Sequence, residues 1–404
     1  MDKKTVVIVG TGAVGLLYGC RLLEAEIGIT KSKTETHFIC RRDYNHCSVH
    51  GIRLESPDGN FYSGKEANLL KRIHRNSSSI PVPSMGVDWI ICAVKSYSLQ
   101  DSEDSLRSLI SPMVGPNTRF LMLMNGLGCQ QIFCEWFGKR RVFVGMAFTC
   151  VNRNDPNDGY SNDSVADDSF VLVNHIAFGA LHIGHSDDDS DELTVASALW
   201  AATKIADKVT VAQSLLHSQW SKLCWNIPFS GLCVALGGVT TDIVANDPDL
   251  RFLADKIMTD TISLANEDMR LRHCEDLALL APDKVAPLLS HLDSEKVRSY
   301  CWGLTDRMGP YKPSTLLDLI KGADLELEYI FRLPLQRARE ISELRRSLAD
   351  GSHVVAGVDI ITDWPHLETV VRQVCATARI AAAKRGRGEK WVPINVLALD
   401  QSTP

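Results

Sequence analysis

The sequence has no run of about 18 uncharged apolar residues, the length that a membrane-spanning helix needs. No signal-peptide pattern precedes its first apolar stretch, and no internal repeat is visible. An excess of positive charge is also absent, because 43 Lys and Arg stand against 49 Asp and Glu, a formal net charge of −6. We therefore expect a cytoplasmic protein whose main partner is neither a membrane nor a nucleic acid.

Metal-binding patterns are missing as well, although the chain contains 12 Cys. No C-x-x-C occurs, and no Cys and His residues have the spacing of a zinc site. The acidic turn at residues 187–191 lacks the Gly and the distant Glu of a calcium loop. Cysteines within apolar runs, such as Cys92 and Cys224, are typical of small core residues in a reducing compartment. We expect no metal site.

A glycine-rich turn stands at the start of the chain. Val6 to Val9 form a β-branched apolar run, which predicts a strand buried on both faces, and residues 16–23 predict a helix. Between them lies G-x-G-x-x-G, formed by Gly10, Gly12 and Gly15. In a dinucleotide-binding fold these glycines allow a tight turn, a close approach to a pyrophosphate and close helix–strand packing. The alternative is a glycine-rich turn without a ligand.

The next predicted strand, residues 37–40, ends in Arg41 and Arg42. In a dinucleotide fold this strand end faces the adenosine ribose, where a carboxylate binds the 2′-OH of NAD and an arginine accommodates the 2′-phosphate of NADP. No carboxylate follows until Asp43. The pattern favours NADP, with a solvated basic turn as the alternative.

Further buried strands are predicted at residues 88–94, 120–124 and 141–148, and helical stretches alternate with them. This alternation is typical of a doubly wound, mostly parallel sheet, the Rossmann fold. Ligands of such sheets lie beyond the carboxyl ends of the strands, where Lys95 and Asn125 follow two of them. The sequence also predicts a β-hairpin around Ser56-Pro-Asp-Gly59 and a surface insertion at residues 152–168.

Helical periodicity replaces the strand pattern from about Val209 onward. Helices are expected at residues 214–236, 250–272, 282–291, 314–319, 325–348 and 367–384. We therefore predict an α/β Rossmann domain over residues 1–208 and an all-α domain over residues 209–404.

Lys222, Asn226 and Ser230 are spaced i, i+4 and i+8, which would place them on one polar line of a helix. A lysine on an otherwise apolar helix needs a partner, and one with a lowered pKa could act as a general acid toward a reduced carbonyl. The alternative is a lysine that extends to solvent. Pro228 within the same helix should remove one backbone hydrogen bond and kink it.

A second polar stretch begins at Ser314, which follows Pro313 and precedes an apolar run, as a helix N-cap does. Such a terminus can hold a carboxylate. Glu326 and Glu328 flank one apolar position, so at most one of them can face the active-site cleft while the other faces solvent. An ordinary helix cap and a solvated glutamate are the alternatives.

Together these motifs resemble one family. The motifs that carry the resemblance are Gly10-Thr-Gly-Ala-Val-Gly15, Val94-Lys95, Asn125-Gly-Leu-Gly128, Lys222-x-x-x-Asn226 and Pro313-Ser-Thr-x-x-Asp318 followed by Glu326. The chain resembles the ketopantoate reductases (2-dehydropantoate 2-reductases). The resemblance implies a Rossmann domain joined to a helical domain like that of 6-phosphogluconate dehydrogenase. It also implies NADPH-dependent reduction of a small-molecule 2-oxo acid to a 2-hydroxy acid, here ketopantoate to pantoate in pantothenate biosynthesis.

The resemblance also implies roles for individual residues. Lys222 would be the proton donor, Glu326 the acid that helps to position the lysine and substrate, and Asn125 the residue beside the nicotinamide and substrate. Substrate-binding positions would be Asn226, Ser230 and Ser314, the last near the carboxylate. Cofactor-binding positions would be Gly10, Thr11, Gly12, Ala13, Val14, Gly15, Arg41, Lys95 and Asn125.

The chain departs from the family pattern at two of these motifs. Ser230 replaces a second asparagine, and Arg332 stands where the family usually has a glycine. Extra material lies near residues 24–36, 66–85, 152–170, 270–310 and 345–365. Another branched or bulky 2-oxo acid therefore remains an alternative substrate, and a non-catalytic NADPH-binding regulator is the alternative from another class. A homodimer is compatible with the sequence, which does not determine the oligomeric state.

Overall fold

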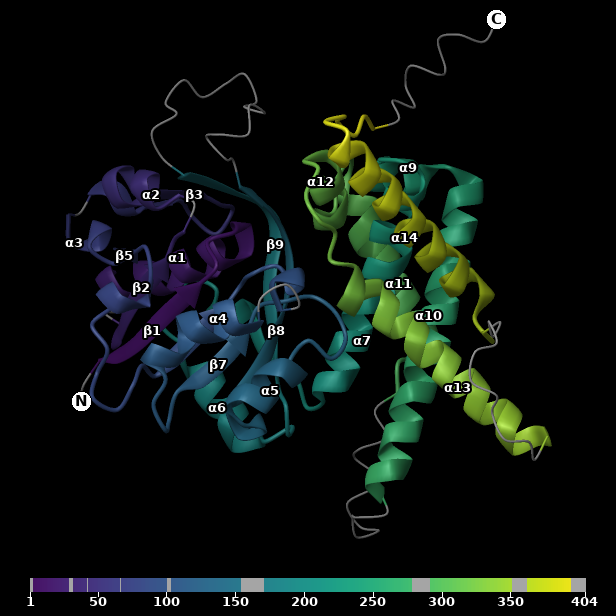
Figure 1. Ribbon diagram of the computed structural model, residues 1–404, viewed down its shortest axis with the longest axis horizontal. Helices are drawn as coiled ribbons and strands as arrows, with labels where there is room; N and C mark the ends of the chain where they lie inside the picture. Colours follow the sequence, from purple (N-terminus) through teal and green to yellow (C-terminus); the bar gives the residue numbers. More distant parts are fainter. Residues whose placement is uncertain are drawn as a thin grey trace, which may run out of the picture. The chain divides into compact units, whose positions relative to one another are not determined.

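A computed structural model gives the arrangement of the chain (Figure 1). It describes residues 3–28, 32–41, 43–65, 67–99, 103–153, 171–277, 291–350 and 362–393. The chain divides into two compact units. The first comprises Met1–Met124 and Cys129–Leu215, and the second comprises Asn125–Gly128 and Leu216–Pro404.

A ten-stranded sheet forms the centre of the first unit, counted over the described residues. Its strands are β1 (Lys4–Val9), β2 (Thr34–Ile39), β3 (Ile52–Glu55), β4 (Phe61–Tyr62), β5 (Ile73–His74), β6 (Trp89–Cys92), β7 (Arg119–Met122), β8 (Val142–Arg153), β9 (Val171–His185) and β10 (Val209–Val211). They follow the order β4-β3-β9-β8-β7-β6-β1-β2-β5, with β10 beside β9. The β8–β9 and β3–β4 pairs are antiparallel and the other pairs are parallel, which confirms the mostly parallel sheet.

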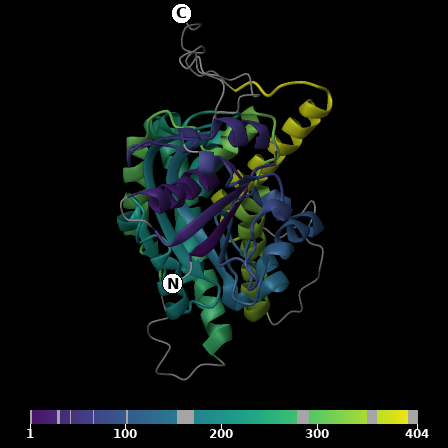
Figure 2. The ribbon, with the colours of Figure 1, turned by 90° about the vertical axis from the view of Figure 1, so that its left-hand side faces the viewer.

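The order of the strands reverses at β1, which lies between β2 and β6. Figure 2 shows the same ribbon turned by 90°, with the N-terminal part of the chain in purple. The helices of this unit are α1 (Ala13–Ile27), α2 (Tyr44–His50), α3 (Ala67–Leu70), α4 (Glu103–Ile110), α5 (Gln131–Phe137) and α6 (Ser190–Ala198). Because parallel crossovers are right-handed, the reversal places α1 on one face of the sheet and α4 and α5 on the other. Val6, Val7 and Ile8 of β1 are fully buried, as expected for a strand covered on both faces.

The second strand begins earlier than the sequence predicts. We expected residues 37–40, but β2 spans Thr34–Ile39. Its polar first half pairs with β1, where Thr34 lies opposite Lys4, and the carboxylate of Glu26 accepts the backbone N–H of Thr36 at 3.0 Å. Backbone pairing to a central strand therefore extends β2 into a polar stretch that lacks the apolar pattern of a buried strand.

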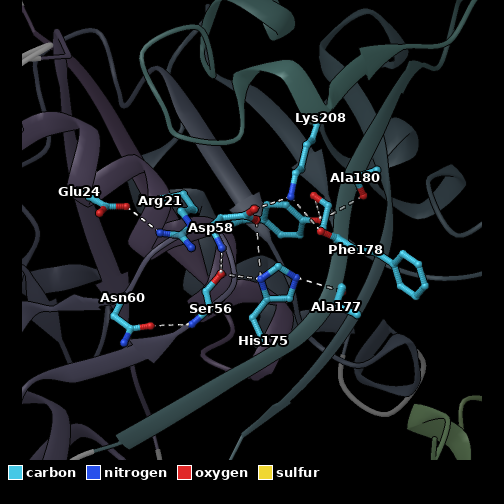
Figure 3. A network of polar contacts seen from close by, with 12 residues as sticks. Arg21, Glu24, Ser56, Asp58, Asn60, His175, Ala177, Phe178, Ala180 and Lys208 are labelled. Carbon is cyan, nitrogen blue, oxygen red and sulfur yellow. Dashed lines mark hydrogen bonds and ion pairs between the residues drawn. The ribbon is translucent and has the colours of Figure 1, made fainter. Parts of the chain in front are cut away.

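The β-hairpin predicted around Ser56-Pro-Asp-Gly59 is confirmed, since β3 and β4 pair across it. Ser56 Oγ lies 2.8 Å from Nδ1 of His175, on β9, and Nε2 of His175 lies 3.1 Å from the carbonyl oxygen of Ala177 (Figure 3). A carbonyl only accepts, so Nε2 carries the hydrogen and Nδ1 accepts from the Ser56 hydroxyl. Burial lowers the pKa of His175, in keeping with a neutral ring.

The same network stabilises a bend in β9. Phe178 adopts a φ of 67°, and the β8–β9 register shifts close by, between Phe148 and Thr149. Lys208 donates to the carbonyl of Phe178 at 3.2 Å and pairs with the carboxylate of Asp58 (Figure 3). These bonds tie the hairpin turn to the bend, so the left-handed conformation of a non-glycine residue is held by surrounding contacts.

The second unit is helical. Its elements are α7 (Leu215–Trp225, whose first residue belongs to the first unit), the π-helical turn η7 (Asn226–Ser230), α8 (Gly231–Ala235), α9 (Thr241–Asn246), α10 (Pro248–Leu277), α11 (Ser294–Met308), α12 (Ser314–Ile320), the π-helical turn η10 (Glu328–Arg332), α13 (Leu333–Asp350) and α14 (Pro365–Gly386). The sheet unit followed by the helical unit confirms the predicted fold class. The helix expected at residues 282–291 lies almost wholly outside the described residues.

The division between the units falls after Leu215, whereas we expected it after residue 208. Val209 to Val211 form β10, which pairs with Leu181 to Ile183 of β9. The backbone N–H of Leu215 donates to the carboxylate of Asp188 at 2.7 Å. Pairing with the sheet therefore keeps residues 209–215 in the first unit.

The helix predicted over residues 214–236 is interrupted. The α-helix α7 ends at Trp225, the π-helical turn η7 follows, and α8 begins at Gly231. Pro228 lies within the π-helical turn. A proline lacks the N–H for the ordinary i→i−4 bond and its ring crowds the preceding turn, so the backbone widens there.

Candidate functional site

The glycine turn between β1 and α1 requires glycine at two of its three motif positions. Gly10 has a φ of +97°, and a Cβ atom there would lie 2.7 Å from the carbonyl carbon and oxygen of Ala93. A Cβ atom on Gly15 would lie 2.1 Å from the carbonyl oxygen of Gly10 and 2.9 Å from Cβ of Ala93. The tight turn and the close packing expected of these residues are both present.

Gly12 differs, because the fold itself does not require it. It has a φ of −71°, stands at the N-cap position of α1, and has no atom within 4 Å of the place its Cβ would take. The first-turn N–H groups of α1, which begins at Ala13, have no partner within the helix. An open approach to unpaired N–H groups at a helix N-terminus fits the pyrophosphate of a dinucleotide.

Two cations predicted to bind the cofactor follow the two strands that flank β1. Arg41 is exposed two residues after β2, and Lys95 is partly buried three residues after β6. Since β2 and β6 flank β1 in parallel, both residues lie at the edge of the sheet where Gly10 ends β1. Arg42 lies outside the described residues.

Arg153 also reaches this turn, and the sequence did not single it out. We predicted a surface insertion at residues 152–168, but β8 continues to Arg153, and residues 154–168 lie outside the described residues. The Arg153 guanidinium donates to the carbonyl oxygen of Thr11 at 2.6 Å and lies 2.5 Å from a carboxylate oxygen of Asp43. Thr11 and Arg153 are 142 positions apart, so no local pattern could have joined them.

The second unit holds the lysine predicted as proton donor. Lys222 lies in the last turn of α7 and is partly buried. Burial lowers the pKa of Lys222 to about 7, and the negative charge of Glu326 acts in the opposite direction. Glu326 itself is buried, with 6% of its surface exposed. The two groups therefore form an electrostatic pair in which the lysine can gain or lose a proton near neutral pH.

Asn226 and Ser230 are both buried polar residues at the two ends of the π-helical turn η7. Lys222 lies four residues before Asn226, in the α-helical part. The straight α-helical line that we expected is therefore wrong in detail, because a π-helical turn contains more residues per turn than an α-helix.

Asn125 lies in a loop, Asn125–Gly128, that belongs to the second unit although it follows β7 in sequence. The side-chain amide of Gln219, on α7, donates to the carbonyl of Gly126 at 3.1 Å. The N–H of Leu127 donates to the carbonyl of Tyr329 at 2.8 Å. Gly126 has a φ of +111°, and a Cβ there would lie 2.5 Å from Tyr329. The loop is thus fixed from both sides by elements of the helical unit.

Both π-helical turns of the described residues adjoin this polar cluster. The turn η7 holds Asn226 and Ser230, and η10 begins two residues after Glu326 and includes Tyr329. The two turns pack against each other, with Phe229 and Phe331 in one hydrophobic core. π-Helical turns are rare in proteins and are frequent at functional sites, so their pairing marks this cluster as a candidate site.

In the second polar stretch, the structure corrects the cap expected at Ser314 and shows which of Glu326 and Glu328 is buried. Ser314 is exposed and is the first residue of α12, while Pro313 occupies the N-cap position, so the predicted serine cap is wrong by one residue. Glu326 is buried, whereas Glu328 is partly exposed and pairs with exposed Arg332 at 3.5 Å. Only one of the two glutamates is therefore shielded from solvent.

Two further observations concern membrane-spanning helices and metal sites. No helix in the described part of the chain combines the length and apolarity that crossing a lipid bilayer requires. Within the same residues, no group of three or more His, Cys, Asp or Glu side chains could hold a metal ion.

A sheet unit with a dinucleotide-type glycine turn and a helical unit with a buried lysine–carboxylate pair define an NAD(P)-dependent oxidoreductase. Comparison with known proteins agrees. The family model "Ketopantoate reductase PanE/ApbA" matches residues 6–167, and "Ketopantoate reductase PanE/ApbA C terminal" matches residues 214–342. The chain belongs to the ketopantoate reductase family, whose members are NAD(P)-dependent enzymes that reduce 2-oxo acids.

Individual relatives are distant in sequence but similar over their whole length. The 2-dehydropantoate 2-reductase of Nostoc sp. is 24% identical over 346 residues, which cover 84% of this chain and 91% of the relative. The crystal structure of 2-dehydropantoate 2-reductase from Geobacter metallireducens GS-15 has a TM-score of 0.68 and 25% identity, and covers 92% of this chain and 99% of that one. A D-mandelate dehydrogenase solved with NADH and anilino(oxo)acetate shares the fold, with a TM-score of 0.65, 17% identity, and coverage of 94% and 99%.

Proposed function

We propose that the chain reduces 2-dehydropantoate (ketopantoate) to pantoate with NADPH. The observation that carries the proposal is the electrostatic pairing of Lys222 with buried Glu326. Each residue lies shortly before a π-helical turn, and burial lowers the pKa of Lys222 to about 7. NADPH, when bound, supplies the hydride that the carbonyl carbon receives. Residues of this chain donate the proton and orient the substrate.

Lys222 donates the proton. Its ammonium group, hydrogen-bonded to the substrate carbonyl, stabilises the negative charge that develops on the oxygen and transfers a proton to it, which leaves a neutral amine and the 2-hydroxy acid. A pKa near the working pH suits a group that must give up a proton and regain it from water in each cycle. Glu326 keeps the lysine charged despite burial, since its carboxylate opposes the lowering of the pKa.

The remaining candidate residues bind and orient. Asn125 is proposed to position the substrate beside the nicotinamide, Asn226 and Ser230 to bind the substrate, and Ser314 to act near its carboxylate. The glycine turn, with Thr11, Ala13 and Val14, is proposed to hold the pyrophosphate, and Lys95 and Arg41 to contact the cofactor, Arg41 at the 2′-phosphate. Gly12 supports this part, because its open surroundings leave room for a phosphate.

The experiment is a spectrophotometric assay of NADPH oxidation by the purified chain with ketopantoate, with NADH and a panel of 2-oxo acids in parallel. Turnover with ketopantoate that is lost in Lys222→Ala, while that variant still binds NADPH, is the expected result. NADPH binding without turnover of any 2-oxo acid would favour a non-catalytic NADPH-binding regulator. A wild-type chain that binds no NADPH would contradict the proposal at its first step.

A different branched or bulky 2-oxo acid is the second candidate substrate, and Ser230 is the observation that favours it. A serine where the family has an asparagine removes an amide and leaves more space at a buried position of η7. The similar D-mandelate dehydrogenase was solved with anilino(oxo)acetate, whose 2-oxo group carries a bulky anilino substituent. Preference for such an acid over ketopantoate, reversed by Ser230→Asn, would establish this candidate.

A cytoplasmic location and a homodimer stay predictions. Light scattering after gel filtration tests the second of them, because a dimer doubles the molar mass of the 44.7 kDa chain.

A further inference from the structure

Asp43 lies just beyond the strand end that decides between NAD and NADP in many dinucleotide folds. It is the first carboxylate after β2, the strand whose end faces the adenosine ribose. In an NAD-dependent protein a carboxylate in this region accepts the ribose 2′-OH, and the same charge would repel the 2′-phosphate of NADP. Asp43 is buried, with 4% of its surface exposed, so solvent screens its charge little.

The carboxylate of Asp43 is not engaged with its own helix. It stands at the N-cap position of α2, where aspartate commonly accepts a first-turn N–H, yet it makes no such bond. Its carboxylate lies instead 2.5 Å from the guanidinium of Arg153. The side chain of Arg153 is itself largely buried, 15% exposed, and reaches Asp43 from the end of β8.

Arg153 makes a second contact that joins this pair to the glycine turn. Its Nη1 donates to the carbonyl oxygen of Thr11 at 2.6 Å. Because the peptide unit is planar and trans, a carbonyl held toward Arg153 also fixes the direction of the N–H of Gly12, on the opposite side of the same peptide. One guanidinium thus neutralises Asp43 and orients the turn proposed to hold the pyrophosphate.

We propose that Arg153 is a specificity-determining residue for the cofactor, acting through Asp43. By pairing with Asp43 it withdraws the carboxylate from the ribose and cancels its charge, which leaves exposed Arg41 as the charge that a 2′-phosphate meets at the end of β2. This inference rests on the proposed NADPH-dependent function. It assigns to Arg153 the removal of a negative charge that would otherwise oppose the 2′-phosphate.

The test is a double-mutant cycle read by binding rather than by turnover. Isothermal titration calorimetry measures the affinities of 2′,5′-ADP and 5′-ADP, which differ only in the 2′-phosphate, for wild type, Arg153→Gln, Asp43→Asn and the double variant. We expect Arg153→Gln to weaken 2′,5′-ADP about tenfold more than 5′-ADP, since an unpaired carboxylate then faces the 2′-phosphate. Asp43→Asn should retain the preference for 2′,5′-ADP, and the double variant should recover most of what Arg153→Gln loses.

Arg119→Gln is the matched control. Arg119 also pairs with a carboxylate through a partly buried guanidinium, 2.6 Å from Glu192, but at the opening of β7, opposite the edge of the sheet where the glycine turn lies. The Arg119→Gln variant should leave the ratio of the affinities for 2′,5′-ADP and 5′-ADP unchanged. Thermal unfolding of every variant shows whether it is folded, and Arg153→Lys, which keeps the charge, provides a second substitution at this position.

The outcomes separate this inference from the proposed function. The inference is overturned if Arg153→Gln leaves the ratio of the two affinities unchanged. It is also overturned if adding Asp43→Asn in the double variant does not restore that ratio. In both cases, wild-type binding of 2′,5′-ADP still supports an NADPH enzyme. A wild-type chain that binds neither nucleotide overturns both.

Discussion

The side-chain amide of Gln219 donates a hydrogen bond of 3.1 Å to the carbonyl oxygen of Gly126. Gln219 lies three residues before Lys222 on α7, and Gly126 directly follows Asn125. The helix that carries the candidate proton donor therefore also holds the loop that carries the candidate asparagine. Gln219 is buried, with 3% of its surface exposed, so water cannot readily replace the bond.

Gln219→Met, which keeps the volume and removes the amide, should lower kcat without changing the affinity for NADPH. The physical reason is that the carbonyl of Gly126 loses its donor, and Asn125 is then less well positioned; misplacement of a substrate-positioning group commonly lowers the rate by about 10²-fold. Steady-state kinetics with ketopantoate and calorimetry with NADPH measure the two quantities.

Gln213→Leu serves as the control for Gln219, because Gln213 is exposed and lies just before α7. It should leave both quantities unchanged. A Gln219→Met variant with wild-type kcat would mean that the Tyr329 contact alone holds the loop.

The pH dependence of turnover should report Lys222. The proton donor is active when charged, so with a pKa of about 7 kcat/KM should be highest below pH 7 and should fall as the pH rises above it. Glu326→Gln removes the negative charge that raises the pKa of Lys222, so its falling limb should move to lower pH. A pH series of kcat/KM for both proteins measures this.

Glu328→Gln is the matched control for Glu326, since Glu328 is partly exposed and pairs with Arg332. It should leave the position of the limb unchanged. A limb that moves to higher pH in Glu326→Gln would contradict the electrostatic pairing of Lys222 and Glu326.

The elements with strong local patterns were the ones the sequence could predict. The apolar run Val6–Val9, the glycine turn and the Ser56-Pro-Asp-Gly59 hairpin each combine a composition with a turn signal, and all three are present. The start of β2 was missed because its residues 34–36 are polar and become a strand only through pairing with β1. Strand formation there is a tertiary effect.

The candidate site shows the same division. Lys222 and Glu326 could be selected because one is a charge on an apolar helix and the other belongs to a spaced motif. Gln219 and Arg153 could not, since each acts on a backbone carbonyl far away in sequence, and a carbonyl has no side chain that a pattern can reveal. The π-helical turns were also beyond prediction, although Pro228 marked the place of one.

Gly12 and Gly15 should separate cofactor binding from folding. Gly12→Ala adds a methyl group where no atom lies within 4 Å, so the melting temperature should hardly change while NADPH affinity falls, because the methyl group fills the space proposed for the phosphate. Gly15→Ala forces a Cβ to within 2.1 Å of the Gly10 carbonyl oxygen and should destabilise the fold itself. Thermal unfolding and calorimetric titration check the two expectations. Unchanged NADPH affinity in Gly12→Ala would support a glycine turn without a ligand.

A buried histidine pair should make the first unit sensitive to acid. Nδ1 of His37, on β2, lies 2.9 Å from Nε2 of His74, on β5. Burial, together with the charges of Arg72 and His74, lowers the pKa of His37 to about 3, while Glu35 lies 3.5 Å from its Nε2. Because the unfolded chain takes up a proton below its ordinary pKa and the folded chain does not, stability falls with falling pH.

His37 alone should account for a loss of about 2 kcal/mol between pH 7 and pH 5. His37→Asn should flatten the decline by that amount, whereas His291→Asn, at an exposed position, should not. Urea denaturation at the two pH values measures the difference. An identical decline in His37→Asn and wild type would mean that the ring is protonated in the folded state.

Among the carboxylates of the helical unit, Asp268 is the one whose replacement we expect to lower the free energy of unfolding most. It is fully buried on α10, accepts the indole N–H of Trp220 at 2.9 Å and the guanidinium of Arg272 at 3.0 Å, and pairs with Arg337 of α13. Asp268→Ala removes the shared acceptor of a buried indole N–H and two arginines and should destabilise the unit by about 3–5 kcal/mol.

Asp306→Ala is the comparison, because Asp306 pairs with Arg251 through exposed side chains at 2.8 Å. Its replacement should lower the free energy of unfolding by less than about 1 kcal/mol. Urea denaturation measures both values. Asp268→Asn, which keeps an acceptor for Trp220 but loses the charge, should fall between them. Since Trp220 lies two residues before Lys222, the Asn variant should also lower kcat if the carboxylate keeps α7 in place. A variant with unchanged kcat and lowered stability would restrict Asp268 to a structural role.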